Sequence, residues 1–354
     1  MDYNYKFPAV RGIQAKREYY ISMVPLSLLN KLFPENSDVV QPEFRAQRKI
    51  NEKRIPIMKN YILMNRDTYV FSALSASING SFKFEKDMGN DDLGTLEISM
   101  DSVFLINDGQ HRKAAIEEAL LEDESLKNET ISIVFFNDQG LERSQQMFTD
   151  LNKHAVKTSN SLATLYDSRD EVAVITKTVI DAVPFLKRYT DKERDILGKN
   201  SSKLFTLISM YKANSKITKN EICDSDTERF LIDFWSNVAN NIVEWNELDS
   251  RMLTKKEVRE NYIVTLSVTL IALGKLGRHF YENKELDISK YLIRLREIDW
   301  MRNNSDNWLG RVIRKNGKVM NNEEAIALTC SKIKSLIGIE LNKEELLKEQ
   351  KLKG

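Results

Sequence analysis

The sequence predicts an α+β protein, in which an N-terminal mixed-sheet α/β domain at residues 1–157 precedes an all-α domain at residues 158–354. β-forming runs and a turn signal at Asn79-Gly80 occur in the first part of the chain. There, a short apolar run also leads directly into a helix, as in sheets that alternate with helices. From Ser159 onward, the apolar residues follow helical spacing. A chain of 354 residues is long enough for two such domains.

The first domain is expected to hold a sheet of about four to six strands with helices between them. Residues 1–17 are interpreted as an irregular arm, and residues 86–94 as a polar loop. Asn79-Gly80 is a hairpin signal between two of the strands, so the sheet is expected to be mixed rather than wholly parallel. The expected strands are 19–26, 69–78, 82–84, 96–100, 103–106 and 131–136, and the expected helices are 27–32, 57–64, 114–121 and 140–151.

The second domain is expected to be helical throughout. Its helix at 261–280 is apolar on almost every side, which predicts a place at the centre of the second core. The charged end at 342–354 is expected to fray. The other expected helices are 161–167, 171–183, 202–213, 230–245, 288–298 and 322–337. All four tryptophans, Trp235, Trp245, Trp300 and Trp308, lie in this half and are interpreted as core packing rather than as platforms for nucleic acid bases.

Composition limits the function classes. Apolar residues make up 42% and charged residues 30%, which is typical of a globular protein with a full core. No long uncharged apolar run and no signal peptide pattern occur, so a cytoplasmic location without membrane contact is expected. The two cysteines are interpreted as buried small hydrophobes, and the three scattered histidines argue against a structural zinc site. With 53 basic and 52 acidic residues, any DNA binding must depend on a local patch.

The stretch at residues 107–115, Asn-Asp-Gly-Gln-His-Arg-Lys-Ala-Ala, joins a buried strand to a helix. Asp108 is expected to be the N-cap of that helix, and Gly109 permits a tight turn. Unpaired N–H groups at a helix start, together with Arg112 and Lys113, would form a seat for a phosphate group. The alternative interpretation is that Asp108 only caps the helix and Arg112 pairs with a carboxylate.

Enzymatic chemistry has few candidates in this sequence. It shows no nucleophile and base pair, no phosphate-binding Gly-rich loop of the Walker type and no metal triad. An enzyme would have to rely on Asp108 to hold a divalent cation and on His111 to transfer a proton. These two residues are therefore the catalytic candidates, for a weak NTPase activity, and a protein without enzymatic activity is the preferred alternative.

The pentapeptide Asp108-Gly109-Gln110-His111-Arg112 resembles the signature of the DGQHR-domain proteins. The order of the surrounding features, including Met-Phe-Thr-Asp-Leu-Asn at 147–152, resembles the DndB-like family, regulatory proteins of DNA phosphorothioate modification systems. The same strand-to-helix elbow is similar to motifs of the ParB and sulfiredoxin superfamily that contact nucleotide phosphates. Sulfiredoxins place a cysteine in this elbow and this chain has none, so thiol chemistry is not expected.

The superfamily resemblance implies a ParB-like first domain with a nucleotide pocket. A nucleoside triphosphate with Mg²⁺ is then the candidate cofactor. The helix bearing Gln145 and Gln146 and the loop after it, with Asn152, occupy places comparable to those that complete the pocket in ParB-like domains. Asn152 is also an ordinary residue for ending a helix. The candidate phosphate-binding residues are Asp108, Gly109, Gln110, His111, Arg112, Lys113 and Asn152.

Two basic segments are candidates for DNA contact. The stretch 39–66 is the strongest basic concentration in the chain, with two acidic residues only, and the stretch 300–318 has a single one, Asp306. Such segments can bind the phosphate backbone, although they can equally be solvated surfaces. The candidate DNA-binding residues are Arg45, Arg48, Lys49, Lys53 and Arg54 in the first segment and Arg311, Arg314 and Lys315 in the second.

Three functions remain open from the sequence. The family resemblance implies a DNA-binding regulatory protein of a phosphorothioation system, which controls transcription of the modification genes. The elbow alone also fits a nucleotide-binding switch, and a DNA-processing subunit of a related phage-defence system is the third alternative. The expected partners are double-stranded DNA, a nucleotide, other proteins of the modification system and a second copy of the chain.

Overall fold

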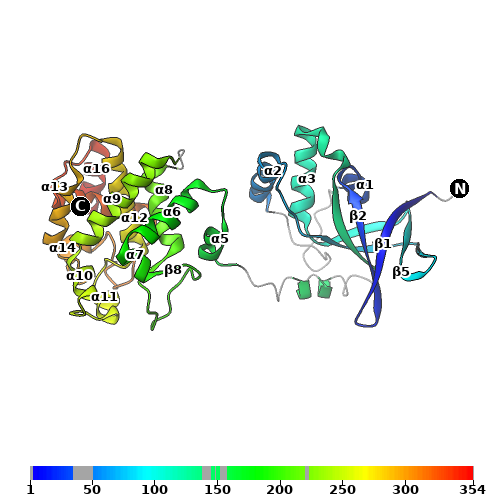
Figure 1. Ribbon diagram of the computed structural model, residues 1–354, viewed down its shortest axis with the longest axis horizontal. Helices are drawn as coiled ribbons and strands as arrows, with labels where there is room; N and C mark the ends of the chain where they lie inside the picture. The colour runs from blue at the N-terminus through cyan, green and yellow to red at the C-terminus, as the bar shows by residue number, and fades with distance from the viewer. Residues whose placement is uncertain are drawn as a thin grey trace. The chain divides into compact units, whose positions relative to one another are not determined.

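The computed structural model describes residues 3–34, 51–137, 145–147, 149–151, 158–219 and 223–353. The chain divides into two compact units, Met1–Val156 and Lys157–Gly354, and each is described by itself (Figure 1). The first contains a mixed sheet with helices, and the second is mostly helical. The predicted fold class is confirmed. Among the described residues, no helix is both long enough and apolar enough to span a bilayer.

The first unit is built on a seven-stranded sheet in the order β4-β5-β1-β2-β7-β3-β6. The pair β3 and β7 is parallel and the other pairs are antiparallel, so the sheet is mixed as predicted. The strands are β1 (Asn4–Gln14), β2 (Arg17–Pro25), β3 (Leu74–Asn79), β4 (Phe82–Asp87), β5 (Asn90–Ser99), β6 (Val103–Asp108) and β7 (Thr130–Asn137).

Helices α1 (Leu29–Leu32), α2 (Ile55–Met64) and α3 (Gln110–Glu122) pack on this sheet, with short 3-10 turns η1 (Leu26–Leu28), η3 (Glu52–Arg54) and η4 (Glu124–Asn128). Alternate residues of the strands, such as Ile131, Ile133 and Phe135 of β7, are buried in one core with Ile116 of α3. Lys59 of α2 pairs with Glu122 of α3 at 2.5 Å, so the two helices are also joined at their surface.

Three predictions for this unit are wrong. Residues 4–14 form strand β1, because pairing with β2 on one edge and β5 on the other orders a segment whose own pattern is weak. The chain does bend at Gly80, where φ is +146°, but β3 and β4 are not paired. Both edges of β3 are already occupied by β6 and β7, so β4 pairs with β5 instead, and the predicted 86–94 loop is mostly strand.

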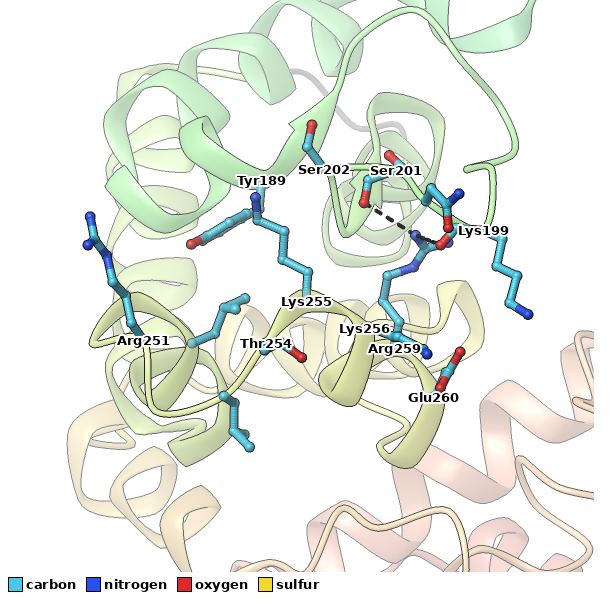
Figure 2. A pocket seen from close by; sticks show the side chains of 13 residues that line it. Tyr189, Lys199, Ser201, Ser202, Arg251, Thr254, Lys255, Lys256, Arg259 and Glu260 are labelled. Atoms are coloured by element: carbon cyan, nitrogen blue, oxygen red, sulfur yellow. Dashed lines mark hydrogen bonds between the residues drawn. The ribbon is translucent and has the colours of Figure 1, made fainter.

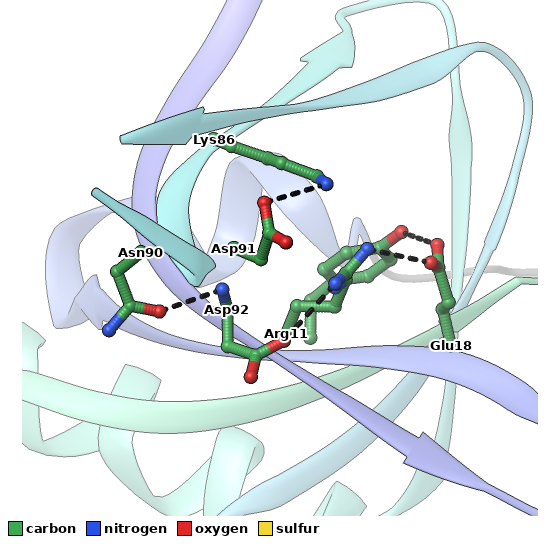
Figure 3. A network of polar contacts seen from close by, with 7 residues as sticks. Arg11, Glu18, Lys86, Asn90, Asp91 and Asp92 are labelled. Atoms are coloured by element: carbon green, nitrogen blue, oxygen red, sulfur yellow. Dashed lines mark hydrogen bonds and ion pairs between the residues drawn. The ribbon is translucent and has the colours of Figure 1, made fainter. Parts of the chain in front are cut away.

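A polar network ties the two hairpins at one side of the sheet (Figure 3). The guanidinium of Arg11, on β1, donates to Glu18 and to Asp92, both at 3.1 Å. These carboxylates belong to β2 and β5, the two strands that flank β1. Lys86 of β4 pairs with Asp91 at 2.9 Å. Both cations thus pair with carboxylates of the same sheet at its surface, which leaves no excess positive charge among these residues.

The second unit contains helices packed around a large apolar core. Gly274 of α12 lies against α8 so closely that a Cβ there would be 2.2 Å from the carbonyl oxygen of Ala213. The helices are α5 (Asn160–Tyr166), α6 (Glu171–Ala182), α7 (Pro184–Tyr189), α8 (Leu207–Thr218), α9 (Ser225–Asn241), α10 (Val243–Asp249), α11 (Lys255–Asn261), α12 (Ser267–Glu282), α13 (Ile288–Leu292), α14 (Ser305–Trp308), α15 (Glu323–Leu336) and α16 (Lys343–Lys353), with the 3-10 turn η5 (Ile293–Glu297). A two-residue parallel pair, β8 (Thr190–Asp191) and β9 (Phe205–Thr206), is a small departure from the predicted all-helical unit.

The tryptophan prediction is confirmed, because all four indoles are fully buried in this core. Cys330 is buried too, and burial raises the pKa of its thiol to about 12, so it packs as an unreactive hydrophobe. The prediction of a frayed end is wrong: residues 343–353 form α16. Lys334 of α15 pairs with the buried Glu345 at 2.8 Å, which anchors α16 on the core.

Candidate functional site

The elbow lies where β6 ends at the edge of the sheet and α3 begins. Gly109 is the N-cap, in the left-handed region with φ 105° and ψ 12°, and no side chain caps the helix. A Cβ at this position would be 2.4 Å from Leu74 Cδ2, so both the backbone angle and the close packing require glycine. Asp108 was expected to be the N-cap and is not. It precedes the glycine, and its carboxylate accepts a hydrogen bond from Arg112 instead.

Arg112 connects the start of α3 to the segment that precedes β3. Its guanidinium donates to Asp108 Oδ2 at 2.6 Å, to the carbonyl oxygen of Ala73 at 3.2 Å and to the hydroxyl of Ser72. Its Nε atom is buried and has no hydrogen-bond partner among the described residues. Most of the donors of this arginine therefore bind the protein itself. Ser72 and Ala73 were not among the predicted site residues, because both lie about 40 residues before Arg112 and the bond to Ala73 uses a backbone carbonyl, which leaves no signal in the sequence.

Lys113 is also occupied within the protein. It is buried, and its Nζ atom pairs with Glu117 Oε2 at 2.6 Å, one turn along α3. The amide of Gln110 donates to the carbonyl oxygen of Ile106 at 3.5 Å, its one hydrogen bond to the residues that the structure describes. The binding of phosphate by Arg112 and Lys113 stays a prediction, and a phosphate group would have to compete with the carboxylates of Asp108 and Glu117.

Asn107, near the end of β6, connects the elbow to neighbouring segments of the first unit. It is fully buried, and its amide donates to Ser77 Oγ at 2.8 Å and to Met147 Sδ at 3.1 Å. Its Oδ1 atom has no hydrogen-bond partner among the described residues. Ser77 lies on β3 and Met147 in the short helical piece at 145–147, so this amide joins three segments. Asn152, which was predicted to complete a phosphate pocket here, lies outside the described residues.

His111 joins the elbow to the first basic segment. Its Nε2 atom accepts a hydrogen bond from the backbone N–H of Asn51 at 2.9 Å, so in this contact the ring carries its proton on Nδ1. Asn51 in turn is the N-cap of η3 and accepts from the backbone N–H of Lys53 at 3.2 Å. Two features that were predicted separately, the elbow and the basic segment, are thus neighbours in the first unit.

The structure describes some of the predicted DNA-binding cations of that segment and not others. Lys53 and Arg54 are exposed and form no ion pair with any described carboxylate. Arg45, Arg48 and Lys49 lie outside the described residues. In the described part of the segment, two positive charges therefore face solvent beside His111, with Glu52 as the acidic residue between them and Asn51.

The second predicted basic segment separates into two kinds of residue. Arg311 is 5% exposed and forms an ion pair with Glu349 of α16, through two hydrogen bonds. It also donates to the carbonyl oxygen of Asn307 at 3.2 Å, which makes it part of the core of the unit. Arg314 and Lys315 are exposed at a turn that Gly317 closes. Only the latter two remain accessible candidates for DNA contact, and their role stays a prediction.

Comparison with known proteins identifies the family. A family model named DndB, described as DNA-sulfur modification-associated, matches residues 7–340, which is nearly the whole chain. The chain belongs to the DndB family. Neither the curated proteins nor the solved structures include a match to it. Membership of the DndB family implies a role in a DNA sulfur modification system. The matched range includes residues of both units and the elbow.

Within this DndB-family chain, the side chains of the elbow contact other residues of the first unit. Arg112, Lys113 and Asn107 are each held by partners from their own unit. Asp108 and His111, the two catalytic candidates, are likewise engaged, the first with Arg112 and the second with Asn51. Their roles as catalytic or phosphate-binding residues stay predictions.

Proposed function

We propose that this chain is a DNA-binding regulatory protein of a DNA sulfur modification system, which controls transcription of the modification genes. Its partners would be double-stranded DNA and the other proteins of that system. Family membership supports the system. The observation that supports DNA binding is the hydrogen bond between His111 and Asn51, which places Lys53 and Arg54 next to the family's elbow motif.

The physical argument rests on the charge of this surface, which we call the elbow face: His111, Asn51, Lys53 and Arg54. The whole chain has a formal net charge of only +1, so long-range attraction to DNA has to come from local groups. Lys53 and Arg54 are exposed without a described acidic partner, and each can therefore neutralise a phosphate and release a counterion. The same segment carries Arg45, Arg48 and Lys49, which add three positive charges in sequence.

A nucleotide-dependent switch that uses a triphosphate with Mg²⁺ is the alternative that the ParB-like elbow suggests. The contacts of Arg112 and Lys113 favour the DNA-binding proposal over it, because both cations already pair with carboxylates of the same unit. In our proposal, the elbow therefore holds the basic segment in place, and the segment contacts the phosphate backbone. Such contacts set position and affinity, not sequence preference.

Removing both cations of the elbow face tests the proposal. Changing Lys53 and Arg54 together to Ala is expected to weaken binding to all duplex sequences. It should also reduce the slope of log K against log salt by about two, since each phosphate contact contributes roughly 0.9. The measurement is a salt titration by fluorescence anisotropy with labelled duplex DNA.

The matched control removes the same formal charge elsewhere in the unit. Lys83 and Lys86 of β4 each pair with a carboxylate, Glu85 and Asp91, so the double change of these lysines to Ala is expected to leave the salt slope unchanged. Equal slopes for wild type and the Lys53/Arg54 variant would show that the elbow face is only a solvated surface.

A further inference from the structure

A large open cavity in the helical unit has no part in the site described above. Its volume is about 980 Å³, near the upper end of ordinary ligand sites. One wall is the loop at 199–202, between β8 and β9, and the other is the turn at 251–254 with the start of α11 (Figure 2). Tyr189, at the end of α7, and Leu248 and Leu253 supply its apolar lining.

The lining of this cavity is strongly basic. Five cations line it, and Glu260 is its only carboxylate, so the lining carries an excess of four positive charges (five minus one). This contrasts with a net charge of +1 for the whole chain. The cations are Lys199, Arg251, Lys255, Lys256 and Arg259. None of the five forms an ion pair with a carboxylate among the described residues.

The walls of the cavity are joined by hydrogen bonds to neutral backbone groups, so these contacts do not neutralise its positive charge. The guanidinium of Arg259 donates to the carbonyl oxygens of Lys199 at 3.2 Å and Ser201 at 3.4 Å, which fixes the loop to α11. Figure 2 shows the bond to Ser201 across the cavity. Thr254 and Glu257 form a capping box at the start of α11, so the helix end is satisfied by its own side chains. The two walls of the cavity are therefore joined to each other by contacts within the folded unit.

Like charges gathered in a concave site repel one another, and a concave wall concentrates their field. A polyanion relieves that repulsion and gains charge-assisted hydrogen bonds. Lys255 lies with its Nζ atom 5.9 Å from the centre of the Tyr189 ring, and Ser202 adds an exposed hydroxyl on the opposite wall. Ammonium groups, a guanidinium and hydroxyls are the groups that bind phosphate oxygens in proteins.

We propose that this cavity is a phosphate-binding site. It would take a ligand with several phosphate charges, either a free polyphosphate compound such as a nucleotide or the backbone of DNA. The proposal does not depend on the elbow face, since the two sites lie in different units. One can therefore fail while the other holds.

The test uses the full chain and inorganic tripolyphosphate as the probe. Isothermal titration calorimetry measures the affinity of the chain for this probe. Lys255 and Lys256 are changed together to Ala, which suits the first turn of a helix. We expect tripolyphosphate to bind the wild type and to bind this variant about tenfold or more weakly, because two charge-assisted contacts are lost. The control is the double change of Lys343 and Lys351 on α16 to Ala, two exposed lysines outside the cavity, which should leave the affinity unchanged.

A second arm identifies the source of the phosphate. The same variants are titrated with duplex DNA at several salt concentrations. A reduced salt slope for the Lys255/Lys256 variant assigns the cavity to the DNA backbone, and an unchanged slope with weakened tripolyphosphate binding assigns it to a free ligand. If tripolyphosphate does not bind the wild type, or binds the cavity variant and the wild type equally, the proposal is wrong.

Discussion

Changing Arg311 to Met is expected to lower the free energy of unfolding of the helical unit by about 3 to 5 kcal/mol, the range for removing one partner of a buried ion pair. Arg311 is 5% exposed, and its guanidinium is shared between the carboxylate of Glu349 and the carbonyl oxygen of Asn307. Its loss leaves the Glu349 carboxylate partly buried without a cation and loosens α16. Urea unfolding followed by tryptophan fluorescence measures this unit alone, because all four tryptophans lie in it.

Two further variants separate the ion pair from a general effect of lost charge. Changing Arg311 to Met and Glu349 to Leu together should recover most of the stability, since a buried pair replaced by apolar side chains is often neutral. Changing Arg314 to Ala, three residues away and exposed, should change the free energy of unfolding by less than about 0.5 kcal/mol. A loss for Arg311→Met no larger than that for Arg314→Ala would contradict the structural role.

Glu244 is expected to make the stability of the same unit fall as pH rises. This carboxyl is 8% exposed, and its Oε2 atom has no hydrogen-bond partner among the described residues. Burial is the main cause that raises its pKa from 4.5 to about 7, and the negative charges of Glu247 and Asp299 add to the effect. The folded protein therefore holds this proton more tightly than the unfolded chain does.

The sign follows from that difference in pKa. Below pH 4.5, both states are protonated and Glu244 has no effect on stability. Between 4.5 and about 7, the unfolded chain loses its proton first, so stability falls as pH rises, and above about 7 the penalty is complete. A shift of this size corresponds to about 3 kcal/mol.

Changing Glu244 to Gln should remove the penalty. The variant is expected to be more stable than wild type by about 3 kcal/mol at pH 8 and by less than about 1 kcal/mol at pH 5, measured by urea unfolding. Glu193→Gln, the same change at an exposed position, should show no such dependence. A gain of equal size at both pH values would mean that the carboxyl of Glu244 is not held neutral in the folded protein.

The sequence predicts those elements that are set by local residue pattern better than those that are set by pairing with distant segments. The strand before the elbow and the elbow helix follow from local pattern, and β6 and α3 are where they were predicted. Strand β1 does not follow from local pattern, because it contains Pro8 and Gly12. Pairing with its neighbours β2 and β5 orders it. Strand β3 was predicted at 69–78 and is observed at Leu74–Asn79, but its pairing with β6 and β7, which come from later in the chain, left no signal in the sequence.

The candidate site shows the same limit. Residue types identified the elbow, but not the partners that Arg112 and His111 find in Ala73 and Asn51, which are backbone groups about 40 and 60 residues earlier in the chain. The basic cavity was missed because the cations at 251–259 were not singled out in the sequence, and because nothing in the sequence places Lys199 opposite them. Arg311 was counted as a surface cation because its acidic partner lies 38 positions away.

The most direct test of the central claim is the DNA affinity of His111→Ala. This change removes the bond to Asn51 and leaves every cation of the elbow face in place. If the elbow positions the basic segment, the variant should remain folded and bind duplex DNA about tenfold more weakly, as measured by fluorescence anisotropy. The reason is that part of the free energy of binding is then spent on ordering the segment. Gln110→Ala, on the same elbow but with only a 3.5 Å contact to Ile106, should bind as wild type does. A folded His111→Ala variant with wild-type affinity for DNA would contradict the account.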